Sequence, residues 1–407
     1  MAMVAVFTSG PGQTFVFSVF VDPILLDTGM SRTELSFLYS VGTVFSAAMS
    51  LAMSHLVGKF GPRLMMGLIA FFFGAACFGI SWANGSVGFL VFFAALRALG
   101  QGSLTMTAIL LAVQWFVRYR GRAMGLVSLG MAAANAFFPP FCQWLIGVVG
   151  WRSAYQVLGV AIWLLVIPAT VFLVKDRPEK IGLHPDGLPP EPTDPRPREN
   201  AAGNILEAAL EPKAARVWRS WRFWQVVLPL SAGPFVVTAL IFHQIAIFAE
   251  HGQDAGVVSV VFVVWSVASA VTTACSGFLL ERFEPKVVLL AVLGLLTVGT
   301  LGLLLVHSVV LALVYAVIMG GASGSLFVIS GVIWVHYYGR KWVSTYQGAG
   351  ALVNITGAAL APLPVAALQQ LTGSYTVGII FVAFVAICCF ALLLSFKSQP
   401  RPYQDEF

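Results

Sequence analysis

The sequence Gly58-Lys59-Phe60-Gly61-Pro62-Arg63 joins two long apolar stretches, and its pattern returns in the second half of the chain. Residues 54–63 align with residues 277–286, 223 positions further on, with basic, Phe, Pro and basic residues in the same places. Three more matches have nearly the same offset: Gly10-Pro11 with Gly233-Pro234, Pro139 with Pro362, and Gly102-Ser103-Leu104 with Gly324-Ser325-Leu326. These matches predict two structurally equivalent halves. In a membrane protein, paired halves are typical of a transporter with its site between them.

The composition indicates a membrane protein. The chain is 58% apolar and only 10% charged, with a mean hydropathy of +0.88, whereas soluble domains carry about 25% charged residues. The five cysteines lie in apolar stretches without metal-ligand spacing, so we expect no metal, no cofactor and no disulfide framework. The first apolar stretch has no basic residue before it and no small-residue cleavage site, which favours a retained helix over a signal peptide.

Twelve apolar stretches are long enough to cross a bilayer, which takes about 20 residues. They are 3–26, 36–57, 64–83, 87–117, 123–149, 153–174, 223–248, 257–280, 287–306, 309–335, 343–370 and 375–396. Open strand edges cannot be satisfied in lipid, and barrel strands alternate over about 10 residues, so these stretches are predicted to be helices. The expected fold class is an all-α membrane protein.

The basic residues predict the orientation. With twelve spans, 20 of the 23 Lys and Arg residues fall in the loops and tails of one side. This bias places both termini in the cytoplasm, and we expect a multi-pass protein of the cell (inner or plasma) membrane. The predicted domains are residues 1–174 and 223–396, each with six helices, a cytoplasmic central loop 175–222 and a cytoplasmic tail 397–407. The central loop is rich in Pro and charge and is interpreted as a tether, with a surface helix over 205–219 as the alternative.

Six plus six spans with a basic turn repeated after spans two and eight resemble the major facilitator superfamily. Its hallmark is Gly-x-x-x-Asp-Arg/Lys-x-Gly-Arg/Lys-Arg/Lys in the loop after the second helix. The first copy here has Ser54 and Gly58 in the Gly and Asp places, followed by Lys59, Gly61 and Arg63, and the second has Gly277, Glu281, Arg282 and Lys286. The resemblance implies two pseudo-symmetric six-helix bundles and alternating access.

A narrower resemblance is to the monocarboxylate-transporter-like branch. It is carried by Ser9-Gly10-Pro11-Gly12-Gln13-Thr14, by Arg97-Ala98-Leu99-Gly100-Gln101-Gly102-Ser103-Leu104, and by residues 115–125. This resemblance implies a small organic anion as substrate. The eighth span lacks the Arg, and the eleventh span the Lys, that carriers of this kind use, so the substrate stays unnamed. Phe138-Pro139-Pro140-Phe141 stands where drug exporters have Gly-Pro-x-x-Gly-Gly.

Alternating access requires a polar site near the middle of the membrane. The polar side chains near mid-span are predicted to bind substrate: Arg97, Gln101, Gln13, Asn135 and Asn354. In the superfamily, helices one, four, five and eleven line the cavity, so these side chains are expected to converge. Gly10, Pro11 and Gly12 precede Gln13 and either break the helix toward a cavity or allow tight helix packing.

Arg97 is the sharpest candidate, because a charge at mid-bilayer costs about 3 kcal/mol or more unless it finds water or a partner. A guanidinium binds a carboxylate through two hydrogen bonds, which suits an anion. Arg97 and Gln101 are four residues apart and share a helix face. The alternative is that Arg97 ties down neighbouring backbone carbonyls. Its counterpart in the second half is Met319, which predicts an asymmetric site.

Two further groups have possible roles. His243 and Gln244 lie near the outer end of span seven, where the histidine either carries a proton or closes an outer gate. The charged residues of the repeated loops either form a cytoplasmic gate or only determine the membrane orientation. They are Lys59, Arg63, Glu281, Arg282 and Lys286.

The predicted function is secondary transport of a small monocarboxylate-like anion by a functional monomer in the lipid bilayer, with proton symport as one mode of coupling. The alternatives are a carrier of a neutral or amphipathic solute and a transport-inactive receptor. An enzyme is not expected, since the six histidines are scattered and no acid pairs with them in a span. No nucleic-acid partner is expected either.

Overall fold

The computed structural model describes residues 1–116, 120–175 and 217–397, and within these ranges the ordered elements are helices without strands. The predicted apolar stretches lie on helices over most of their length, and residue 117 lies outside the described residues. Three parts of the chain lie outside the described residues: most of the predicted central loop, the tail beyond Lys397, and the residue Arg118. The chain forms two compact units: unit 1 contains Met1–Gly29 and Val41–Asn204, and unit 2 contains Met30–Ser40 and Ile205–Phe407.

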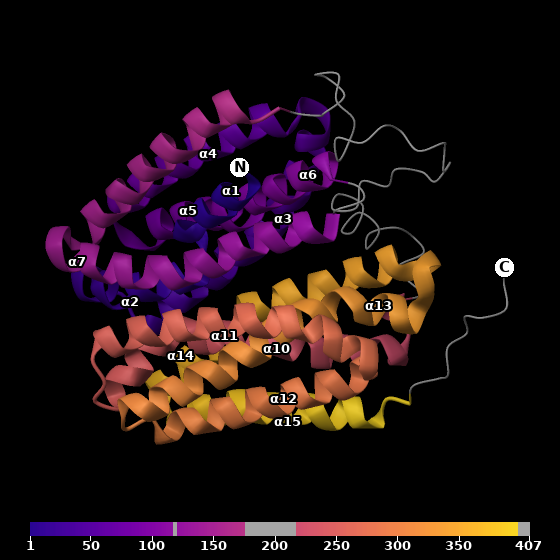
Figure 1. Cartoon of the computed structure of the whole chain (residues 1–407). Helices are drawn as coiled ribbons and strands as arrows, with labels where there is room; N and C mark the ends of the chain where they lie inside the picture. Colours follow the sequence, from indigo (N-terminus) through magenta and orange to yellow (C-terminus); the bar gives the residue numbers. More distant parts are fainter. Residues whose placement is uncertain (117–119, 176–216, 398–407) are drawn as a thin grey trace, which may run out of the picture. The chain divides into compact units, whose positions relative to one another are not determined.

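The helices of the first half run side by side (Figure 1). Its elements are α1 (Ala2–Thr8), the 3-10 turn η1 (Gly10–Gly12), α2 (Thr14–Thr28), α3 (Arg32–Phe60), α4 (Pro62–Ser81), α5 (Gly85–Leu96), the π-helical η2 (Arg97–Leu104), α6 (Thr105–Trp115) and α7 (Arg120–Leu173). Gly150, with φ 77° and ψ 162°, divides α7 into two helices. The first predicted span is therefore α1, η1 and α2, and the fourth is α5, η2 and α6.

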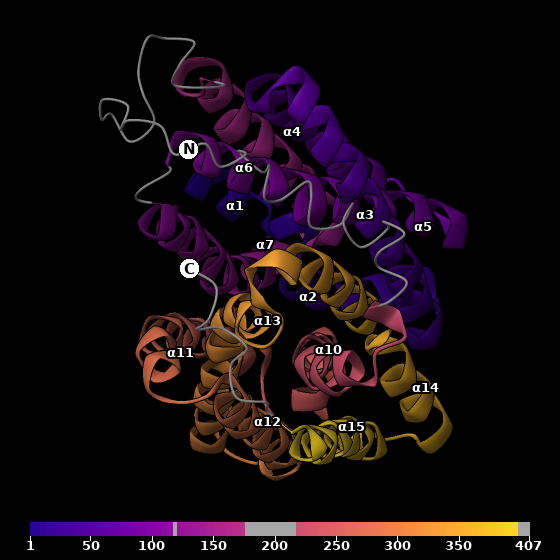
Figure 2. The ribbon, with the colours of Figure 1, turned by 90° about the vertical axis from the view of Figure 1, so that its right-hand side faces the viewer.

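The second half has longer uninterrupted helices. Its elements are α10 (Trp221–Glu250), α11 (Ala255–Arg282), α12 (Pro285–Gly302), the 3-10 turn η5 (Leu303–Leu305), α13 (Val309–Leu360), α14 (Pro362–Thr372) and α15 (Thr376–Ser395). Two candidate membrane spans, Val309–Tyr338 and Tyr346–Thr372, divide the length of α13 and α14 between them. Viewed along the bundle, α10 lies among α12, α13, α14 and α15 (Figure 2).

The repeated loop produces the same local structure in both halves. Pro62 and Pro285 each occupy the first helical position, of α4 and α12, where the missing N–H of proline removes no helical hydrogen bond. Gly150 and Gly373 both have φ near 77°, at equivalent turns. A positive φ favours glycine, so both halves need this residue at the same turn. The repeat therefore extends well beyond residues 54–63 and 277–286.

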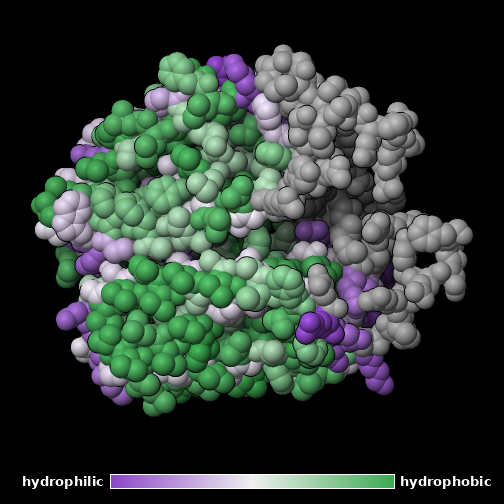
Figure 3. All heavy atoms as spheres, in the orientation of Figure 1, coloured by the Kyte–Doolittle hydropathy of each residue, from purple (hydrophilic) through white to green (hydrophobic). Residues whose placement is uncertain are grey.

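The surface of the helices suits a bilayer. Nine helices of the described part of the chain are long and apolar enough to cross a membrane. Large apolar side chains such as Phe72, Phe172 and Phe278 are exposed on the helix flanks. In the space-filling view, hydrophobic residues cover the sides of the helices and hydrophilic residues gather toward their ends (Figure 3). Lipid removes the hydrophobic cost of these exposed side chains, so the structure has the outward-facing apolar band of a membrane protein.

Candidate functional site

The first transmembrane segment is broken at Gly10-Pro11-Gly12. After the 3-10 turn η1, Gln13 is extended, with φ −94° and ψ 154°. The N–H of Val16 bonds to the carbonyl of Gln13 at 3.2 Å, whereas in a continuous α-helix it would bond to that of Gly12. The break therefore releases the carbonyl of Gly12 from the helical ladder inside unit 1.

Arg97 binds this released carbonyl. Its Nη1 donates to the Gly12 carbonyl at 3.1 Å and to Thr14 Oγ1 at 3.3 Å, and its Nε donates to Thr43 Oγ1 at 3.1 Å. Among the residues whose burial is described, Arg97 is the one buried Arg or Lys, at 4% exposure. The acceptors in these three bonds are neutral oxygens, and the bonds orient the guanidinium.

Close backbone packing fixes the break against Arg97. A Cβ on Gly12 would lie 2.4 Å from the carbonyl oxygen of Leu96 and 2.9 Å from Cα of Gly100. Only glycine fits between these backbone atoms. Arg97 itself begins the π-helical stretch η2, and π-helical turns are frequently found at functional sites. The sequence thus places a cation, a helix break and an irregular helix together.

The other predicted residues of unit 1 are less closely connected to Arg97. Gln13 is buried, and its Nε2 donates to Ser9 Oγ at 3.1 Å. Gln101 is exposed, although it lies one turn from Arg97. Asn135 is half-buried, and its Oδ1 has no hydrogen-bond partner in the described protein. The structure brings Gln13 next to the Gly12 and Thr14 contacts of Arg97, while the described bonds join neither Gln101 nor Asn135 to them.

In unit 2, the predicted residues form separate contacts. Asn354 Oδ1 accepts a hydrogen bond from Ser231 Oγ at 2.6 Å. His243 is fully buried, with Nε2 at 2.9 Å from the Pro362 carbonyl and Nδ1 without a protein partner. Both amide atoms of Gln244 are buried and also lack a protein partner. His243 and Gln244 therefore lie inside unit 2, not on an exposed rim.

The basic residues that end each repeated loop contact their own unit. Arg63 Nη2 donates to the Val171 carbonyl at 2.6 Å, and Lys286 Nζ donates to the Leu394 carbonyl at 3.3 Å. Val171 and Leu394 are themselves equivalent under the 223-residue offset. In both halves, a cation thus caps the C-terminal end of the unit's last helix, where carbonyls and the helix dipole attract positive charge. Lys59 and Arg282 are exposed, and the side chain of Glu281 lies outside the described residues.

An acidic residue has an equivalent role at the opposite ends of the helices. In unit 1, Asp27 Oδ2 accepts from Arg152 Nε at 3.0 Å and from Trp151 Nε1 at 3.2 Å. In unit 2, Glu250 accepts from Ser374 Oγ and from the backbone N–H of Tyr375 at 2.9 Å. The offset of 223 relates Asp27 to Glu250 and Arg152 to Tyr375. Each acidic side chain therefore connects the end of its helix to the residues that follow Gly150 or Gly373, the glycines with positive φ.

Sequence reasoning missed several of these partners. Thr43 and Thr14 were not predicted as ligands of Arg97, and Ser231 was not predicted beside Asn354. A hydroxyl in an apolar helix is a weak signal, because it can equally bond to its own helix backbone. The contact between Asp27 and Arg152 could have been predicted, since the repeat aligns Asp27 with the acidic Glu250.

With this architecture in place, the comparisons with known proteins identify the class. The family model described as Major Facilitator Superfamily matches residues 2–246 and 230–407, so the chain belongs to that superfamily. The probable sulfoacetate transporter SauU of Cupriavidus necator is 29% identical over 157 residues, which cover 38% of this chain and 36% of the relative. The match thus spans about a third of that relative's length.

Two further similarities extend over nearly the whole chain. The nitrite extrusion protein of Bacillus subtilis is 22% identical over 399 residues, which cover 95% of this chain and 91% of the relative. A solved bacterial homologue of the human lysosomal transporter Spinster superposes with a TM-score of 0.72 at 16% identity, covering 98% of both chains. The second comparison supports the major facilitator fold and nothing finer.

Proposed function

We propose that this chain is a secondary active transporter that moves a small organic anion across a membrane by alternating access. The observation that carries the proposal is Arg97. Its guanidinium is buried beside a broken helix, in a medium where charge interactions are strong. A guanidinium can bind a carboxylate with charge-assisted hydrogen bonds, which suits an organic anion.

The relatives support the same substrate class. Sulfoacetate and nitrite, named for two of them, are anions. We assign a monocarboxylate-like substrate, with Gln13, Gln101 and Asn135 in unit 1 and Asn354 in unit 2 as the polar side chains that contact it. Family membership also supports transport rather than enzymatic catalysis and a multi-pass location in a membrane. A functional monomer in the cell membrane, with both termini in the cytoplasm, is part of the same proposal.

The coupling ion in this proposal is a proton. Among residues with described burial, no Asp or Glu side chain is buried, while His243 is fully buried with its Nδ1 lacking a protein partner. His243 is therefore the protein's own candidate for a proton carrier, because an imidazole nitrogen can bind and release a proton. A substrate that crosses as the acid would carry the proton itself and would not require His243.

A second candidate function is transport of a neutral or amphipathic solute. It is favoured by the same three bonds of Arg97, because they also suffice to hold Gly12 and Thr14 in place without any substrate. A transport-inactive receptor would bind a solute and fail to exchange it. Counterflow in vesicles distinguishes the receptor from either carrier.

Uptake into proteoliposomes tests the proposal. Radiolabelled lactate, pyruvate and sulfoacetate are offered with and without an inward proton gradient. We expect gradient-stimulated uptake that falls roughly 10–100-fold in Arg97→Gln, as the loss of about 1.5–3 kcal/mol of charged hydrogen bonding predicts. Arg97→Lys should retain part of it, and His243→Gln should lose only the response to the gradient.

The matched control is Arg152→Gln, which removes a half-buried arginine of the same unit. Each variant is first shown to keep the thermal unfolding transition of the wild type. Uptake of anions that is equal in wild type and folded Arg97→Gln would refute the assigned role of Arg97. Failure of every anion to enter or to compete, alongside counterflow of a neutral solute, would establish the second candidate.

A further inference from the structure

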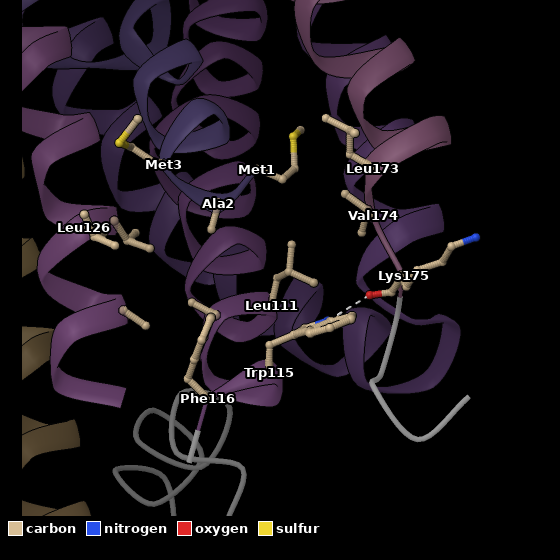
Figure 4. A pocket seen from close by; sticks show the side chains of 13 residues that line it. Met1, Ala2, Met3, Leu111, Trp115, Phe116, Leu126, Leu173, Val174 and Lys175 are labelled. Carbon is tan, nitrogen blue, oxygen red and sulfur yellow. Dashed lines mark hydrogen bonds between the residues drawn. The ribbon is translucent and has the colours of Figure 1, made fainter. Parts of the chain in front are cut away.

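Each unit has a cavity at the same place in the repeat. The cavity of unit 1 has a volume of about 550 Å³ and lies between the start of α1, the end of α6 and both ends of α7. In the close view, apolar side chains such as Leu111 and Leu126 surround it, and the indole of Trp115 donates to the Lys175 carbonyl (Figure 4). Lys175 is the one charged side chain among its lining residues.

The cavity of unit 2 is lined by equivalent positions with different chemistry. Four lining residues of unit 1 correspond to four of unit 2 under the 223-residue offset: Trp115 to Tyr338, Ala123 to Tyr346, Leu173 to Phe396 and Val174 to Lys397. The second cavity is smaller, at about 270 Å³, and is completed by Ser220, Arg222, His336 and Tyr337. Hydroxyl and cationic groups thus replace the apolar wall.

The basic residues of this cavity come from three separate elements. Arg222 lies in the first turn of α10, His336 lies in α13, and Lys397 follows the end of α15. Lys286, which does not line the cavity, fixes the end of α15, because its Nζ also donates to the carbonyl of Phe396. The fold therefore holds an arginine and a lysine at the wall of one cavity, where both remain exposed.

Two tyrosines provide further donors. Tyr338 and Tyr346 stack with ring centroids 3.8 Å apart and an interplanar angle of 18°. The hydroxyl of Tyr338 is buried without a hydrogen-bond partner in the described protein, and Arg222 is close enough for its charge to act on that hydroxyl. The hydroxyl of Tyr337 already accepts from the Lys286 backbone N–H at 3.2 Å. None of the described residues that line the cavity is Asp or Glu, while Glu284, outside the cavity, is close enough for its charge to act on the Tyr337 hydroxyl.

We propose that this cavity of unit 2 is a binding site for a phosphate group, with Arg222, Lys397 and Tyr338 as its ligands. An arginine fork, a lysine ammonium and a phenol hydroxyl match a tetrahedral anion with several acceptor oxygens. The cavity volume of about 270 Å³ accommodates a phosphate with a short ester. The site is separate from Arg97 and does not depend on the transport proposal.

The phosphate could be the headgroup of an anionic phospholipid or a free phosphorylated compound. Trp218, Trp221 and Trp224 surround the start of α10, and tryptophans of this kind mark the lipid headgroup level. Basic pockets among helix ends are known to take anionic headgroups. Both sources present the same phosphate chemistry, and three probes distinguish them.

The test measures the thermal unfolding midpoint of the full chain in a neutral detergent. The probes are phosphatidylglycerol, diacylglycerol with the same acyl chains, and glycerol 3-phosphate. We expect phosphatidylglycerol to raise the midpoint, with an apparent affinity about tenfold weaker in Arg222→Gln and in Lys397→Gln. Diacylglycerol should give no shift. A response to glycerol 3-phosphate as well would identify the free compound as sufficient, and its absence would identify the lipid.

Two controls keep the experiment decisive. Arg219→Gln removes an exposed cation that does not line the cavity, and Lys175→Gln removes the cation of the unit 1 cavity. Both should respond to the probes as the wild type does. If a charge variant fails to fold, Tyr338→Phe removes only the hydroxyl and should still weaken the response. No shift with either phosphate probe, or equal shifts in wild type and the folded cavity variants, would overturn the proposal.

Discussion

The two halves of this chain have the same contacts at their helix ends and different ones at their centres. In unit 1, Gly10-Pro11 lies in a 3-10 turn that breaks the helix, whereas in unit 2 Gly233-Pro234 lies inside the continuous helix α10. Arg97 is buried in the first half, and the buried Met319 takes its place in the second. A Cβ on Gly299 would lie 2.6 Å from Met319 Sδ, so the methionine packs closely against α12.

This difference shows what a Gly-Pro pair can and cannot do. Proline removes one backbone donor in both helices, yet only one helix breaks. The break occurs where the Arg97 guanidinium donates to the released carbonyl of Gly12, because a buried carbonyl without a partner costs about 1–3 kcal/mol. Met319 offers no donor, so the second half keeps its helical hydrogen bonds. Among the residues with described burial, the buried Arg or Lys therefore lies in unit 1.

The largest expected effect comes from Gly12→Ala. The new Cβ would meet two backbone atoms, the Leu96 oxygen at 2.4 Å and Gly100 Cα at 2.9 Å, neither of which can move as a side chain can. We expect a loss of roughly 3 kcal/mol, at the upper end for overpacking, seen as a lower thermal unfolding midpoint together with lost transport. Gly147→Ala is the control, since nothing lies within 4 Å of its new Cβ. A wild-type midpoint for Gly12→Ala would mean that the break is not held by this contact.

Much of this architecture was predictable from the sequence. The apolar stretches, the repeated loop and the family resemblance predicted an all-helical major facilitator fold, and the family match and the structural similarity confirm it. A buried charge such as Arg97 stands out in an apolar stretch because its cost demands a partner. Its partners do not stand out, because two are hydroxyls and the third is a backbone carbonyl that only the helix break exposes.

The repeated cations show the same limit. A gate was one interpretation of Arg63 and Lys286, and the structure shows each capping a helix end inside its own half. Sequence can locate a cation at a loop, but the carbonyl that it reaches lies 108 residues away in both halves. Whether these cations also act at a gate stays a prediction.

The second prediction tests whether Arg63 and Lys286 stabilise their units by the same amount. Arg63→Ala and Lys286→Ala should each lower stability by about 1 kcal/mol, the net value of one or two hydrogen bonds to exposed carbonyls. The two losses should be similar, because Val171 and Leu394 end equivalent helices. Thermal unfolding in detergent measures both, with Arg219→Ala as the control. A large loss of transport without a loss of stability in either variant would instead assign that residue to a gate.

The smallest expected effect distinguishes the contacts of Asp27 from those of Glu250, at the helix ends opposite Arg63 and Lys286. Asp27 forms an ion pair with Arg152 at 2.9 Å, with side chains 45% and 34% exposed, so the pair is worth about 0–1 kcal/mol and is screened by salt. Glu250 accepts from neutral donors, the Ser374 hydroxyl and the Tyr375 N–H. The destabilisation by Asp27→Asn should therefore shrink between about 0.05 M and 1 M salt, whereas that by Glu250→Gln should not. A double-mutant cycle with Arg152→Met isolates the ion pair. Equal salt dependence in both variants would show that the two acids stabilise their units by the same interaction, despite their different partners.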